Sequence, residues 1–213
     1  LDMELVGWIG AGNPQLDVLL YADADFAGDK SDTKSTSSVL LVMKGPRSFF
    51  PLSPASKKQP CTSHSTPESE LVSMDLAVRT VGLPALTRWE EIIQRKLSIQ
   101  FMEDNNAAIR MIETGRFPLM RHLGRTHKVN LASLHEIFES GDLVMNRCDS
   151  ARQSADIFTK AFPQNNKWVE VRHLVNLYLP SESKQLMRSG ENPKPAMAAK
   201  EPVQRPVRRV VEY

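Results

Sequence analysis

The chain has 213 residues, of which 41% are hydrophobic and 24% are charged, which suits one domain with its own core and an appendage. Its two cysteines, Cys61 and Cys148, have no Cys or His partner at zinc spacing, which argues against a disulfide scaffold and a structural zinc site and favours a reducing compartment. No apolar run is long enough to cross a membrane, and the chain starts at Leu1 without a basic and apolar leader, so we expect neither a membrane span nor a signal peptide.

The net charge of +2 is unevenly distributed along the chain. From Pro180 to Tyr213 there are seven Lys or Arg against four Glu, which leaves the preceding residues close to neutral. Nucleic-acid binding by the folded part would therefore have to come from local patches. We predict a linker in residues 1–15, a folded domain in 16–178, and a disordered, basic and proline-rich tail in 179–213.

Three strands are predicted at the start of the domain. Residues 16–23 form a compact apolar run that suits a buried strand. Residues 36–43, rich in Ser and Val, follow after a polar turn. Residues 48–57 form the third strand, and Pro51 and Pro54 favour an edge position for it because proline cannot donate to a strand ladder.

A helix is predicted after the third strand. Thr66 suits the N-cap, and Pro67 fits the first helical position. The helix should run toward Val81, where Gly82 and Pro84 are expected to break it before a second helical stretch.

Strands and helices alternate in the second half of the domain. The sequence predicts, in chain order, a strand at 97–104, a short helix capped by Asn105, a helix at 127–139, a strand at 143–148, a helix starting near Ala155 and a helix at 167–177. Consecutive strands suit an antiparallel meander, and strands that alternate with helices suit parallel additions. We therefore expect an α/β fold with a mixed five-stranded sheet, its first three strands antiparallel, and helices on both faces.

Four acidic residues lie where predicted elements begin or end: Asp23, Glu70, Asp104 and Asp156. Asp23 and Asp104 close strands, and sites in such sheets form at the carboxyl ends of neighbouring strands. Glu70 shares the helix stripe that should face the sheet, whereas Glu68 lies about 200° around the helix and should point elsewhere. Asp156 opens a helix, where the helix dipole favours an anion.

Three further acids compete for these positions. Asp25 shares a strand face with Asp23, and Asp149 ends the last strand, so both are kept as alternatives. Glu103 should face the side opposite to Asp104 because side chains alternate along a strand.

Carboxylates that converge repel one another unless cations neutralise them. Oxygen ligands select hard ions, so Mg²⁺ is the expected occupant, with Mn²⁺ as the second candidate. Two such ions about 4 Å apart can activate water and stabilise the leaving oxygen of a phosphodiester, which favours a nuclease.

Six segments resemble, in the same order, the ribonuclease H domain at the end of copia-type retrotransposon polyproteins: YADADFAGDKSDTKSTS, SKKQP, STPESELVS, EDNNAAI, RTHKVNL and ADIFTKAFP. The match spans roughly residues 16–178. It implies the three-layer ribonuclease H-like fold, two-metal cleavage of the RNA strand in RNA–DNA hybrids, and metal binding by Asp23, Glu70, Asp104 and Asp156. The chain departs from the family at His127-Lys128, where Lys-His is common, and has no His in the loop before Asp156.

The resemblance also implies the partners and the setting of this domain. They are an RNA–DNA hybrid, the reverse-transcriptase domain of the same polyprotein, of which residues 1–15 would be a remnant, and an intracellular site in a cytoplasmic virus-like particle without a membrane partner. The alternative is a catalytically inactive module of the same fold that binds nucleic acid or has a structural role. The candidate nucleic-acid contacts are Lys57, Lys58, Asn105, Arg125, His127 and Lys128.

Overall fold

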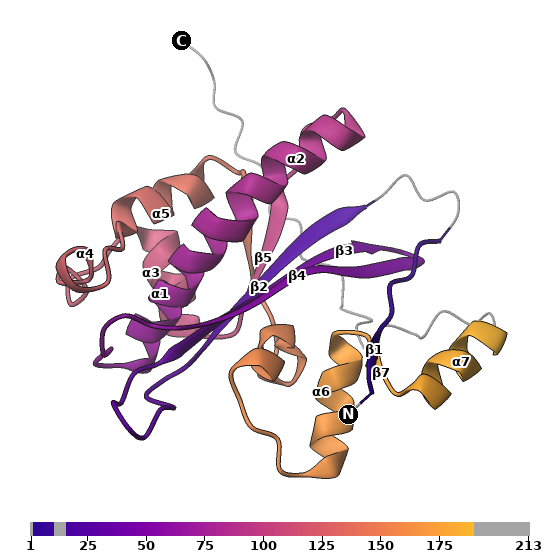
Figure 1. The fold of residues 1–213 in the computed structure, drawn as a ribbon. Coiled ribbons are helices and arrows are strands. Elements are labelled where there is room, and N and C mark those ends of the chain that lie inside the picture. Colours follow the sequence, from indigo (N-terminus) through magenta and orange to yellow (C-terminus); the bar gives the residue numbers. More distant parts are fainter. Residues whose placement is uncertain (1, 11–15, 190–213) are drawn as a thin grey trace.

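The computed structural model describes residues 2–10 and 16–189, and a five-stranded sheet forms its centre (Figure 1). The spatial order is β4-β3-β2-β5-β6, where the first three are antiparallel and β5 and β6 add in parallel. The predicted mixed sheet and the edge position of its third strand are thus confirmed. The bounds are β2 (Asp17–Asp25), β3 (Thr36–Gly45), β4 (Ser48–Lys58), β5 (Ile99–Glu103) and β6 (Leu143–Arg147).

Helices cover both faces of this sheet, as predicted (Figure 1). One face carries α1 (Thr66–Ala77), η1 (Val78–Gly82), α2 (Leu83–Ile93), α3 (Asn106–Thr114), the short α4 (Leu123–Thr126) and α5 (Leu131–Glu139). After β6 the chain passes through η2 (Ser150–Arg152) and reaches the other face with η3 (Ser154–Phe158) and α6 (Asn165–Leu174). None of the helices in these described ranges is long and apolar enough to cross a membrane.

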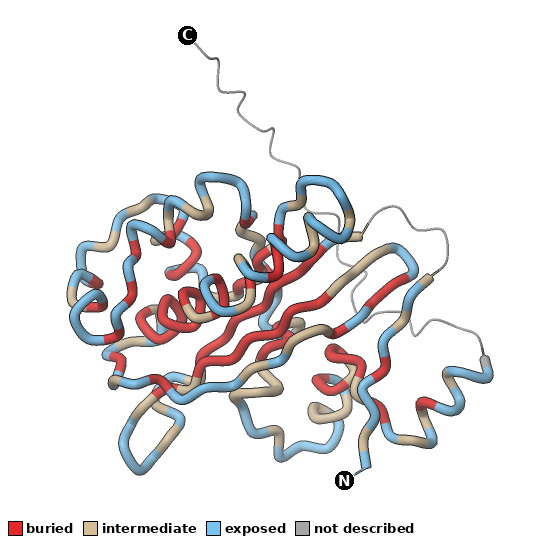
Figure 2. The backbone as a smooth tube through the Cα atoms, turned by 45° about the horizontal axis from the view of Figure 1, so that its top comes forward, coloured by how far each residue is buried: buried red, intermediate tan, exposed pale blue. Residues whose placement is uncertain are grey.

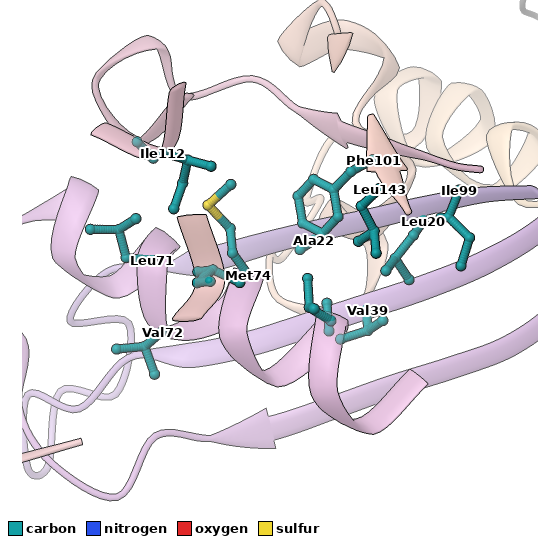
Figure 3. Packing of buried hydrophobic residues seen from close by; sticks show 14 of the residues in the cluster. Leu20, Ala22, Val39, Leu71, Val72, Met74, Ile99, Phe101, Ile112 and Leu143 are labelled. Carbon is teal, nitrogen blue, oxygen red and sulfur yellow. The ribbon is translucent and has the colours of Figure 1, made fainter. Parts of the chain in front are cut away.

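The strand β2 is buried on both faces, which explains its unbroken apolar sequence (Figure 2). Leu20 packs into the larger core under α1, α3 and α5, where Phe101 and Met74 are also fully buried (Figure 3). Tyr21 points to the smaller core on the face of η3 and α6. The sheet therefore holds the end of β2 rigidly from both sides, and Asp23 lies at that end.

The helix after β4 does not break at Gly82 and Pro84 as predicted. Instead η1 is a π-helix that joins α1 to α2, and the Leu83 N–H bonds to the Val78 carbonyl. This wider turn leaves Pro84 in the first turn of α2, where its missing N–H costs little. Gly82 lies so close to the sheet that a Cβ would meet Leu20 Cδ2 at 2.9 Å, so the glycine permits close packing.

Two later helices also differ from the prediction. The predicted helix at 127–139 begins only at Leu131, because Lys128 has a left-handed φ of 62° and Asn130 caps α5 by accepting from the Ser133 N–H. The helix predicted near Ala155 is the 3₁₀ segment η3. Apolar periodicity encodes neither the left-handed Lys128 nor the tighter winding of η3.

Segments outside the predicted domain also pack onto it. β1 (Glu4–Leu5) pairs antiparallel with β7 (Leu177–Tyr178), so part of the predicted linker is a strand. α7 (Pro180–Ser189) lies within the predicted disordered range and is therefore a correction to it. Arg172, almost fully buried, holds α7 by two 2.6 Å bonds to the Glu182 carboxylate. The rest of that range, residues 190–213, lies outside the described residues.

Asn105 caps α3 as predicted, because its Oδ1 accepts from the N–H groups of Ala107 (3.0 Å) and Ala108 (3.1 Å). Replacing Asn105 by Ala is expected to lower the free energy of unfolding by about 1 kcal/mol. Urea titration measures this loss, and Asn106→Ala, on the exposed neighbour, is the matched control. Equal stability of the Asn105 variant and wild type would contradict the capping role.

Candidate metal centre

Three of the four predicted acids converge at one end of the sheet. Asp23 lies near the end of β2, Asp104 directly follows β5, and Glu70 comes from the first half of α1. Each offers a carboxylate oxygen, and these oxygens all lie within 4.8 Å of one another. The convergence follows from the topology, because β2 and β5 are parallel neighbours whose carboxyl ends meet. We call Asp23, Glu70 and Asp104 the acidic triad.

The helix α1 is hydrogen-bonded to the end of β2. It begins one residue earlier than predicted, with Ser65 as the N-cap that accepts from the Glu68 N–H. One turn beyond Glu70, the Ser73 hydroxyl donates to the backbone carbonyl of Asp23 over 2.7 Å. The buried Ser38 hydroxyl also approaches that carbonyl, at 3.3 Å. The backbone of Asp23 is thereby fixed relative to Glu70.

The fourth predicted acid, Asp156, is joined to the triad through a lysine. Lys160 Nζ lies 3.2 Å from Asp23 Oδ1 and 2.8 Å from Asp156 Oδ1. The Thr159 hydroxyl donates to Asp23 Oδ2 over 2.6 Å. Asp156 therefore lies beside Asp23, but an ammonium group separates the two carboxylates.

The burial of these acids disfavours their charged forms. Burial, and then the charges of Glu103, Asp23 and Asp104, raise the pKa of Glu70 well above its ordinary 4.5. Burial and the charge of Asp23 raise the pKa of Asp156 to about 7, although Lys160 opposes this shift. The site thus holds more acidic groups than Lys160 alone can compensate when they ionise.

Glu103 is the member of this site that sequence reasoning missed. We expected it to face away from Asp104, but β5 ends at Glu103, so Asp104 no longer follows strand alternation. Glu103 is fully buried, and burial together with the charges of Asp104 and Asp23 raises its pKa, opposed by the bond from the Asn105 N–H. The sequence did contain a sign of this position. Glu103 shares its strand face with the apolar Ile99 and Phe101, so it could have been expected to be buried with them.

The buried oxygen atoms test whether a cation fits here. Glu70 Oε2 and Glu103 Oε2 are buried and have no hydrogen-bond partner among the described residues. Such atoms are costly in an apolar interior unless a positive group compensates them. Oxygen-only donors of this kind suit Mg²⁺ or Mn²⁺, so the triad fits a divalent cation.

The raised pKa values predict how the metal-free protein responds to pH. Above pH 4.5 the unfolded chain loses the protons of Glu70 and Glu103, whereas the folded state keeps them. The contribution of these two protonated acids to the free energy of unfolding is therefore complete below pH 4.5 and is lost as the pH rises toward their folded pKa values. The thermal midpoint in a chelator should therefore fall between about pH 7 and about pH 8.5, a window in which histidines are already largely neutral.

Differential scanning calorimetry measures this decline, and Mg²⁺ should oppose it. Glu70→Gln is expected to flatten the decline, because the amide does not titrate. A midpoint that rises with pH in this window would contradict the assignment.

The other two acidic alternatives are not members of the triad. Asp149 is exposed, and its Oδ1 accepts from the Ala151 N–H as the cap of η2. Asp25 is half-buried at the end of β2, and burial raises its pKa. Neither belongs to the group of oxygens that lie within 4.8 Å of one another.

The six predicted nucleic-acid contacts differ in their exposure and in the partners that they already have. Lys57, Lys58 and His127 line one cleft between β4 and α1, although the His127 side chain is fully buried and cannot reach a phosphate as placed. Lys58 forms ion pairs with Asp29 and Asp32. The three remaining residues are Asn105, used as a cap, and the exposed Arg125 and Lys128.

No protein-family model matches the chain, and no curated protein matches it. Its structural neighbours include ribonuclease H1 of the archaeon Halobacterium salinarum, with 12% identity, a TM-score of 0.47, and coverage of 67% of this chain and 94% of that one. LC11-RNase H1 in complex with an RNA/DNA hybrid is similar at 11% identity and a TM-score of 0.44, covering 67% and 94%. The foamy viral protease-reverse transcriptase in complex with dsDNA is similar at 8% identity and a TM-score of 0.40, covering 76% and 94%.

Proposed function

We propose that this chain is a metal-dependent endonuclease that hydrolyses the RNA strand of RNA–DNA hybrids. The observation that carries the proposal is the acidic triad, whose oxygens gather within 4.8 Å at the carboxyl ends of β2 and β5. Two of its side chains are buried, and Glu70 retains an unpaired oxygen. Such a cluster is well suited to binding a divalent cation and poorly suited to a purely structural role.

In this proposal each residue has a distinct task. Asp23, Glu70 and Asp104 hold Mg²⁺, or Mn²⁺, and Asp156 completes the ligand set of a second ion. The bound ions would supply positive charge to the scissile phosphate and make a water more acidic. Thr159 orients the Asp23 carboxylate, and Lys160 keeps Asp23 and Asp156 close together.

Exposed cationic side chains would bind the backbone of the nucleic acid. Lys57, Arg125 and Lys128 are exposed and would contact phosphates, which fix the register of a duplex. Lys58, Asn105 and His127 remain in the proposed set as residues that shape this surface. Preference for an RNA strand would come from its 2′-hydroxyl groups and from the groove shape of the hybrid.

The sequence resemblance supports a wider setting. We include in the proposal a copia-type retrotransposon polyprotein as the source, its reverse-transcriptase domain as a partner, and a cytoplasmic virus-like particle as the location. The part of this chain that resembles the ribonuclease H domain of such a polyprotein is residues 16–178, and residues 1–15 would be a remnant of the upstream polymerase region.

Incubation with a labelled RNA–DNA hybrid tests the proposed activity. We expect cleavage of the RNA strand in Mg²⁺, no cleavage in excess chelator, and full activity in the control variant Glu113→Gln, whose acid is exposed on α3. Intact RNA at high protein concentration in both Mg²⁺ and Mn²⁺ would overturn the proposal.

A second candidate is the inactive binding module, and the position of Lys160 favours it. The ammonium group already forms ion pairs with both Asp23 and Asp156 without a metal. Retention of a hybrid in a mobility-shift assay without any cleavage would support this candidate over the nuclease.

A further inference from the structure

Lys160 lies between two acids of the proposed metal centre. Its Nζ atom is 3.2 Å from Asp23 Oδ1 and 2.8 Å from Asp156 Oδ1, and the side chains of these acids are only 2% and 14% exposed. Little water screens charges at this depth, so the ammonium group interacts with both carboxylates more strongly than a surface lysine would. A cation that belongs to the chain is therefore held where the proposed function places a divalent ion.

The backbone determines the position of Lys160 beside Asp156. The N–H groups of Thr159 and Lys160 both donate to the Asp156 carbonyl, over 3.1 and 2.9 Å. These bonds close one helical turn after η3, and residues four apart in such a turn lie on the same side of the chain. The ammonium group thus reaches Asp156 through a local contact that does not involve the triad.

Both oxygens of Asp23 meet donors from this segment. Oδ1 faces the Lys160 ammonium group, and Oδ2 accepts from the Thr159 hydroxyl. The two donors differ in mobility, because the branched Thr159 side chain is restricted at its first rotatable bond, whereas the long side chain of Lys160 is 37% exposed. Lys160 can therefore turn its charge into water without a change in the backbone.

We propose that Lys160 competes with a divalent ion for Asp23 and Asp156, and so sets the metal concentration at which the centre fills. The inference rests on the proposed function, in which these two acids share the second ion. An ammonium group and Mg²⁺ cannot both bind the same oxygens closely, because the two cations repel one another. Mg²⁺ also binds carboxylate oxygens at about 2.0–2.1 Å, closer than the ammonium group lies.

The competition gives Lys160 an effect on stability that depends on metal. In chelator, the ammonium group compensates two acids of low exposure and stabilises the fold, because an acid left there without a partner is costly. In excess metal the bound ion compensates the same acids, and Lys160 no longer contributes. An ordinary structural ion pair would stabilise the fold equally under both conditions.

Calorimetric titration of the full 213-residue chain with Mn²⁺ at constant pH tests the competition. Lys160→Met keeps the length of the side chain and removes its charge. We expect wild type to bind the second Mn²⁺ ion at least about 10-fold more weakly than this variant does, the effect of removing one close charge pair. Lys160→Arg keeps the charge and should bind Mn²⁺ as wild type does. Lys167→Met, on α6, is the matched control, because its lysine pairs with the exposed Glu170 on the surface.

Thermal midpoints separate this competition from a purely structural role. In chelator, Lys160→Met should unfold at a lower temperature than wild type, and in saturating Mn²⁺ the two midpoints should converge. The proposal is overturned if the difference persists in saturating Mn²⁺. It is also overturned, with the proposed function intact, if wild type and Lys160→Met bind Mn²⁺ equally tightly. Absence of Mn²⁺ uptake by both proteins would instead overturn the proposed function together with this inference.

Discussion

Replacing Asp104 by Asn is expected to reduce cleavage of an RNA–DNA hybrid by at least about 1,000-fold, the upper range for removing one preorganised electrostatic group. The same change should leave the metal-free protein at least as stable as wild type. Asp104 contributes one of the three carboxyl groups whose oxygens lie within 4.8 Å, and losing its charge relieves repulsion in the triad. The side chain is only half-buried, so the amide can be solvated.

Two measurements on one preparation check this pair of effects. Cleavage rates with Mg²⁺ give the activity, and the thermal midpoint in chelator gives the stability. Asp142→Asn, on the exposed turn before β6, controls for the loss of one negative charge elsewhere. A large drop in the midpoint would identify Asp104 as a structural residue, and unchanged cleavage would exclude it from the metal centre.

Replacing Phe101 by Ala is expected to lower the free energy of unfolding by about 3–5 kcal/mol. Phe101 is fully buried in the larger core (Figure 3). Its ring meets the ring of Phe138, on α5, edge-on with centroids 5.4 Å apart. The cavity left by the ring cannot collapse easily, because the neighbouring side chains belong to a sheet held on both faces. Activity should also fall, since β5 carries Asp104 at its end.

Urea titration measures the loss, and Leu119→Ala is the comparison, because Leu119 is 81% exposed and its truncation should cost little. A loss below about 1 kcal/mol for Phe101→Ala would show that the core repacks around the missing ring.

Local patterns were sufficient for much of this fold. The apolar run of β2, the prolines of β4 and the cap at Asn105 each determine their element through nearby residues, and each prediction is confirmed. The joined helices α1 and α2 were missed because Gly82 has its role through contact with Leu20, which is 62 positions away in the chain. Propensity rules treat that glycine as a break, whereas packing makes it a close contact.

The sequence predicted the three acids of the triad but not every residue around them. Asp23, Glu70 and Asp104 were identified because strand ends and a helix stripe can be read from the sequence, and the structure brings them together. Glu103 was missed because its side-chain direction depends on the residue at which β5 stops. The approach of His122 and His127 to Glu68 was also missed, since it depends on the path of the chain around α4.

The ammonium group of Lys160 has a consequence for chemical labelling. Burial acts to lower the pKa of Lys160, but the charge of Asp23 and the bond to Asp156 outweigh it and raise that pKa above the ordinary 10.5. An amine reacts with acylating reagents only through its unprotonated form, so Lys160 should be modified far more slowly than the exposed Lys57. Neutralising Asp23 would remove one of the two ion pairs of that amine, so the acylation rate of Lys160 reports the charge of the two acids that contact it.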